Sequence, residues 1–131
     1  MIALDTNVVL QFLVQDDPDQ AALAGKLISC LTVDALGFIS REVMVEFVWV
    51  LERAYRHSRV EVADALEGLP AAAEIEVEAG DDVGFALFRY RNDGFGFADL
   101  MIAAASRRVG ASELVTFDHK AARIDGVRLL A

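Results

Sequence analysis

Short apolar runs alternate along the chain with longer segments in which apolar residues recur at helical spacing. Apolar or alternating runs predict strands at residues 2–4, 36–39, 75–78, 114–117 and 127–130. Helical periodicity predicts helices at residues 8–14, 20–31, 41–56, 60–69, 80–90 and 98–105. Strands that alternate with helices favour an α/β fold with a mostly parallel sheet and helices on both of its faces.

The length and the hydropathy of the chain indicate how many domains it has and whether it spans a membrane. At 131 residues, the whole chain from residue 1 to residue 131 is expected to form a single domain. No apolar run approaches the ~18 residues that a membrane-spanning helix needs. No basic segment precedes the first apolar run, which Asp5 interrupts, so no signal peptide is expected and a cytoplasmic location is predicted.

The charge and the single cysteine exclude some kinds of site. The net charge of −9 argues against a broad basic surface for nucleic acid. It is compatible with a metal-dependent nuclease, because carboxylates that hold cations can bind phosphate. Cys30 is the one cysteine, which rules out an internal disulfide and a cysteine-based metal cluster. Its place in an apolar helical pattern predicts a buried thiol.

Four acidic residues stand at positions where a parallel sheet would gather them. Asp5 and Asp118 each follow an apolar strand, and the carboxyl ends of parallel strands meet at one edge. Asp99 lies in the first turn of a helix that follows a loop. Glu46 lies in a helix that is apolar on nearly all sides, which predicts burial on several faces. A carboxylate is costly to bury there without a partner. Each acid alone has a structural explanation, and Asp5 in particular is a good helix N-cap, but together they predict one site.

Four carboxylates at one place would repel one another and force some of them to take up protons. A divalent cation removes that conflict. An oxygen-only ligand set selects Mg²⁺ or Mn²⁺ rather than zinc. An ion held in this way can activate water for hydrolysis of a phosphodiester bond.

The segments around these acids resemble the motifs of one family. Ile2–Val8 resembles the first acidic motif of the PIN-domain ribonucleases, and Val45–Leu51 resembles the second, a Glu in an apolar helix. Phe97–Ala103 and Leu114–Asp118 resemble the third and the fourth. The match covers nearly the whole chain in the right order. Within that family, the chain resembles in particular the VapC-type toxins of type II VapBC toxin–antitoxin modules.

The resemblance implies a three-layer α/β/α sandwich with a central, mostly parallel sheet, and an Mg²⁺- or Mn²⁺-dependent endoribonuclease that cleaves RNA. It implies that Asp5, Glu46 and Asp99 carry the metal, directly or through water, and that Asp118 completes the set. It also implies a cognate antitoxin, whose C-terminal segment covers the active-site groove, and a homodimer. By the same resemblance, the small polar residues that orient the carboxylates and waters are Thr6, Asn7 and Thr116.

Two features qualify the resemblance. Many relatives carry a further acid three residues before the third motif's Asp, where this chain has Gly96, so a fifth ligand is not expected. The acidic net charge means that contact with RNA must be local. The candidates for that contact are Arg53, Arg56, Arg89, Arg91 and Lys120.

Other functions stay open on the sequence. A phosphatase with an aspartyl nucleophile would want an acid where Asn7 stands, and a phospho-acceptor receiver domain would leave Glu46 without a role. A non-catalytic PIN-like module that binds nucleic acid or protein is a third possibility. A PIN-domain nuclease that processes RNA outside any toxin–antitoxin module is a fourth.

Overall fold

The computed structural model describes residues 1–131 and contains six α-helices, one short 3-10 helix and five short strands. Nearly every predicted helix and strand is present, with bounds that differ by a few residues. The elements in chain order are β1 (Ile2–Ala3), α1 (Thr6–Leu13), α2 (Pro18–Ser29), β2 (Gly37–Ile39), α3 (Arg41–Arg53), α4 (Arg59–Leu66), β3 (Ile75–Val77), α5 (Gly80–Asp93), α6 (Phe97–Arg108), β4 (Leu114–Thr116), η1 (Ala121–Arg123) and β5 (Val127–Leu129).

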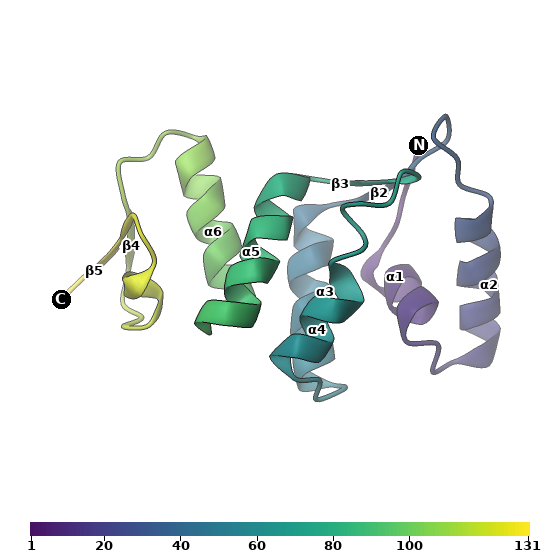
Figure 1. The fold of residues 1–131 in the computed structure, drawn as a ribbon, viewed down its shortest axis with the longest axis horizontal. Coiled ribbons are helices and arrows are strands. Elements are labelled where there is room, and N and C mark those ends of the chain that lie inside the picture. The colour runs from purple at the N-terminus through teal and green to yellow at the C-terminus, as the bar shows by residue number, and fades with distance from the viewer.

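All strand pairing is parallel, and it falls into two sheets. One sheet has the order β1-β2-β3, and the other consists of β4 and β5. The predicted α/β class with parallel strands is therefore confirmed. The strands do not form one continuous sheet, because β1 pairs with β2 alone and no strand pairs with its other edge. In Figure 1, β4 and β5 lie beyond α6 at one end of the molecule, whereas β1, α1 and α2 lie at the other end.

The core lies between the three-stranded sheet and helices α3 to α6. Its largest fully buried side chains include Ile39 of β2, Phe47 and Leu51 of α3, and Tyr90 of α5. Arg59 lies over the Tyr90 ring at 4.4 Å from the ring centre. It also donates hydrogen bonds to the backbone oxygens of Tyr90 and Phe95, which ties the start of α4 to the end of α5.

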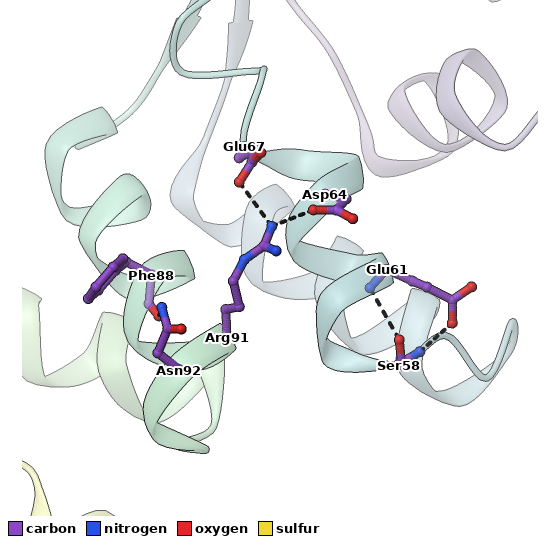
Figure 2. Close-up of polar contacts among 7 residues, drawn as sticks. All are labelled: Ser58, Glu61, Asp64, Glu67, Phe88, Arg91 and Asn92. Atoms are coloured by element: carbon purple, nitrogen blue, oxygen red, sulfur yellow. Dashed lines mark hydrogen bonds and ion pairs between the residues drawn. The ribbon is translucent and has the colours of Figure 1, made fainter.

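Side-chain caps fix where several helices begin. Asp17 accepts hydrogen bonds from two backbone N–H groups at the start of α2, and Ser40 accepts one from Val43 at the start of α3. Ser58 and Glu61 form a reciprocal capping box at the start of α4, which Figure 2 shows. Such caps satisfy N–H groups that have no partner inside the helix.

Two predictions about burial are wrong. Cys30 is exposed, because it stands at the C-terminal cap of α2 and not inside the helix. Helix α3 is buried on one side only. Phe47 faces the core, whereas Trp49 on the other side is 57% exposed. The apolar residues around the whole circumference of α3 do not show which side is covered.

The C-terminal segment, residues 109–131, packs less deeply than the rest. Its fully buried side chains are Ala121 and Ile124, while Val115 of β4 and Phe117 just after it are exposed. No helix of the chain is both long enough and apolar enough to span a membrane.

Candidate active site

Asp5 lies between β1 and α1 and caps the helix. Its Oδ1 accepts a hydrogen bond of 2.8 Å from the backbone N–H of Thr6. The Thr6 side chain is buried and its hydroxyl does not make this contact, whereas Asn7 is exposed. The cap uses one oxygen of an exposed carboxylate, which leaves the other oxygen of Asp5 free to act as a ligand.

Glu46 is exposed on α3, and the prediction that it is a buried carboxylate is wrong. Phe47 and Val48 take the core positions of this turn, so Glu46 points away from the core. Its carboxylate lies on an open groove of about 500 Å³ between α3 and α6. The groove is lined by Arg41, Glu42, Val45, Glu46, Trp49, Met101, Ile102 and Ala105.

Asp99 lies in the first turn of α6 and is partly buried. Burial raises the pKa of its carboxyl, the negative charge of Asp118 raises it further, and Lys120 acts in the opposite direction. The Asp99 carboxylate lies against Gly96. A Cβ added at residue 96 would lie 2.9 Å from Asp99 Oδ2. A side chain at Gly96 would require the end of the Asp99 side chain to shift by rotation.

Asp118 lies in the loop between β4 and η1. Its Oδ1 accepts a hydrogen bond of 2.9 Å from the backbone N–H of Ala121. Its own backbone N–H donates to the hydroxyl of Thr116 at 3.0 Å. Thr116 thus holds the backbone that carries Asp118, in keeping with the positioning role that the resemblance implies.

The four acids do not gather into one cluster in this structure. No group of three or more Asp, Glu, His or Cys side chains lies close enough together to hold one ion. The predicted meeting at one sheet edge assumed that the first and fourth strands belong to the same sheet, and here β1 and β4 belong to different sheets. The structure brings together Asp99 and Asp118, which interact through their charges.

This pair suits a hydrated Mg²⁺ or Mn²⁺ ion. Mg²⁺ commonly uses one or two carboxylates and completes its shell with water and phosphate. The charge of Asp118 raises the pKa of Asp99, and a cation close to both carboxylates would offset that repulsion. The roles of Asp5, Glu46, Asp99 and Asp118 as metal ligands stay predictions.

The cations predicted to contact RNA differ in their surroundings. Arg89 pairs with Asp93 at 2.8 Å, and Arg91 pairs with Asp64 and Glu67, as Figure 2 shows. Neighbouring acids therefore offset both of these charges. The candidates that form no ion pair are Arg53, Arg56 and Lys120.

Trp49 was not among the predicted site residues, because it lies in a helix whose apolar residues favour burial. The structure places this indole on the groove beside Glu46. Its separation of three residues from Glu46 puts the two on one side of α3. That spacing was the available signal, and the surrounding apolar residues obscured it.

The chain matches known proteins over most of its length. The family model of the PIN domain matches residues 2–127. The chain is also similar to a protein named VapC ribonuclease from Aquifex aeolicus (strain VF5), with 23% identity over 120 residues. That alignment covers 92% of this chain and 89% of the relative. The residues matched by the family model include all four candidate acids, which are Asp5, Glu46, Asp99 and Asp118.

Proposed function

This chain belongs to the PIN-domain family, and from that premise we propose that it is an Mg²⁺- or Mn²⁺-dependent endoribonuclease. The observation that carries the proposal is the pair of Asp99 and Asp118, whose charges interact at the junction of α6 and β4. The relative named VapC ribonuclease supports RNA as the substrate.

In this proposal, the metal ion, when bound, activates water and stabilises the charge that develops on the phosphate. Asp99 and Asp118 supply oxygen ligands, and Asp5 and Glu46 are the further carboxylates of the site. The hydroxyl of Thr116 and the backbone N–H of Ala121 fix the loop and the carboxylate of Asp118. Gathering all four acids requires β1 and β4 to come closer together than they are in this structure.

Lys120 contributes one positive charge to a site that holds two carboxylates. That charge acts on Asp99, and we expect it to contact a substrate phosphate that approaches the carboxylate pair. The acidic chain therefore has a cation at the point where an anionic substrate must bind. This arrangement suits one phosphate of a nucleic acid and not an extended duplex.

We further propose that the chain is the toxin of a type II toxin–antitoxin module. In such a module, residues 1–131 act as a single cytoplasmic domain that dimerises and is inhibited by a cognate antitoxin. The name of the relative, VapC ribonuclease, supports this assignment. An adjacent open reading frame for a short protein with a DNA-binding N-terminus would support it as well, whereas a lone gene would favour an RNA-processing nuclease.

A non-catalytic binding module is the second candidate function. One observation favours it, namely that no three acids gather in this structure. Such a module would bind its partner without needing a divalent ion. Metal dependence therefore separates the two functions.

The test is cleavage of a panel of structured RNAs by the purified chain with Mg²⁺, with Mn²⁺ and with EDTA. We expect cleavage with either metal and none with EDTA. Asp99→Asn and Asp118→Asn should each reduce the rate at least about hundredfold, since each removes a charged ligand. Asp34→Asn is the matched control, because Asp34 is exposed on the turn before β2.

Circular dichroism would establish that each variant folds. Equal cleavage by the parent and by both site variants would show that the site assignment is wrong. An RNA that binds with EDTA present and stays intact with either metal would favour the binding module.

A further inference from the structure

We propose that Trp49 is a stacking platform for an unpaired base of the RNA substrate, with Arg41 and Arg53 contacting the flanking phosphates. This inference rests on the proposed function and adds a base-binding subsite at Trp49. The enzyme would act on RNA that presents an unpaired base at the groove between α3 and α6. A duplex, whose bases are stacked on one another, would not fit this surface.

Trp49 has the exposure and the position that stacking requires. Its side chain is 57% exposed, although a large aromatic residue in an apolar helix is usually covered. It lies on α3 three residues after Glu46, so the indole and the carboxylate share one side of the helix. An indole held on a helix offers a rigid, flat surface for a base.

The groove beside Trp49 has the size and the lining for a base. Its volume of about 500 Å³ is within the range of roughly 300–1,000 Å³ that is typical of small-molecule pockets. Trp49 and Val45 of α3 face Met101 and Ile102 of α6 across it. Apolar walls around a flat aromatic ring favour the face of a base over a phosphate or a sugar.

The groove leads to the carboxylate pair. Ile102 lines this groove and also an adjoining hollow of about 180 Å³, to which Asp99 and Thr116 contribute. Asp99 precedes Ile102 by three residues, so the two lie on the same side of α6. A strand of RNA that lies along α6 from Trp49 would therefore bring its next phosphate toward Asp99.

One arginine lies on each side of Trp49 along α3. Arg41 lines the same groove as Trp49, and Arg53 follows Trp49 by four residues along α3, which places it beside the indole. Neither arginine side chain forms an ion pair, so both are available for phosphates. Glu42 and Glu46 share the groove, so cations alone do not attract RNA here.

The acidic net charge makes stacking the main source of affinity. A chain with a net charge of −9 gains little from long-range attraction to phosphate. Stacking of a base on an aromatic ring is independent of net charge and tolerant of sequence. An unpaired base on Trp49 therefore explains how an acidic nuclease can hold RNA.

Trp49 is the one tryptophan of the chain, so its fluorescence reports on this position alone. The experiment titrates the parent protein with a short single-stranded RNA and with its duplex, in EDTA so that no cleavage occurs. A labelled copy of each RNA gives the affinity independently by anisotropy. We expect saturable quenching with the single strand, and a much weaker effect with the duplex.

Trp49→Leu should weaken binding of the single strand roughly ten- to hundredfold, and Trp49→Phe should retain most of the affinity. Phe88→Leu is the matched control, because Phe88 is a similarly exposed aromatic residue on α5 that does not line this groove. Arg41→Gln and Arg53→Gln should each reduce the salt dependence of binding.

Saturable binding by anisotropy without a change in tryptophan emission would overturn the inference while leaving the nuclease function intact. Unchanged affinity of Trp49→Leu would overturn it as well, and so would emission that responds to an antitoxin peptide but not to RNA. Failure of the proposed function has a different signature, namely intact RNA when Mg²⁺ or Mn²⁺ is supplied in place of EDTA.

Discussion

The two sheets of this molecule differ in how firmly the rest of the chain holds them. The sheet of β1, β2 and β3 borders a core in which Ile39, Phe47 and Tyr90 are fully buried. The pair of β4 and β5 has no fully buried strand residue, and Phe117 just after β4 is 78% exposed. The first region carries most of the apolar burial, whereas the second carries Asp118 and the residues that position it.

The total accessible surface agrees with this difference. It is 7683 Å², whereas a monomer of 14.3 kDa is expected to expose about 6,800 Å². Regions with little buried apolar surface open at a low cost in free energy. We therefore expect the segment that carries Asp118 to open more readily than the core.

The largest expected contrast between the regions comes from one substitution made in each. Phe47→Ala removes a ring that is 0% exposed and should lower the free energy of unfolding by about 3–5 kcal/mol. Phe117→Ala removes a ring from the solvent-exposed loop and should change it by less than about 0.5 kcal/mol. Urea denaturation of both variants measures the difference. Equal destabilisation would mean that the C-terminal segment packs into the core in solution.

Amide hydrogen exchange gives a second and smaller contrast. The N–H of Leu4 bonds to Phe38 within the first sheet, and the N–H of Leu130 bonds to Thr116 within the second. We expect the amide of Leu130 to exchange at least about tenfold faster, since local opening exposes the less buried sheet first. Mass spectrometry or NMR of the folded chain measures both rates. Protection of Leu130 equal to that of Leu4 would contradict the comparison.

The elements of the fold could be predicted because each has a local signal. Ser40 marks the start of α3, and apolar periodicity marks its body. The end was placed at Arg56, but the helix ends at Arg53. Arg56 has a φ of 53°, a left-handed conformation that a helix cannot continue through. The spacing of apolar residues does not show at which residue the backbone leaves the helical conformation.

The arrangement of the site depended on information that is not local. A three-residue strand such as β4 has no feature that selects its neighbour, so its separation from β1 could not be foreseen. The sequence predicted that all four acids meet at one sheet edge, and in the structure the charge of Asp118 acts on Asp99, whereas no three of the acids gather. The exposure of Glu46 and Trp49 was missed, because a helix that is apolar all round does not show which side its neighbours leave uncovered.

The smallest expected effect tests whether the two regions meet at the site. Burial and the charge of Asp118 raise the pKa of Asp99, so Asp118→Asn should lower that pKa toward the value set by burial alone. NMR titration of the Asp99 carboxyl carbon measures it, and Asp125→Asn, an exposed acid near the chain's end, is the matched control. An unchanged titration would mean that β4 does not lie beside α6 in solution.

The raised pKa of Asp99 also determines how the free energy of unfolding depends on pH. Because the folded protein holds the Asp99 proton more tightly than the unfolded chain does, ionisation of Asp99 disfavours the folded state. That penalty is fully present above the raised pKa and disappears as the pH falls through it and below the ordinary value of 3.8. Asp99→Asn should therefore unfold at a higher urea concentration than the parent at pH 7, and the two should converge near pH 3. An Asp99→Asn variant that is less stable than the parent at pH 7 would show that the Asp99 carboxylate makes a favourable contact in the folded state. The cation that Asp99 and Asp118 are proposed to bind would then not be needed to offset the charge of Asp99.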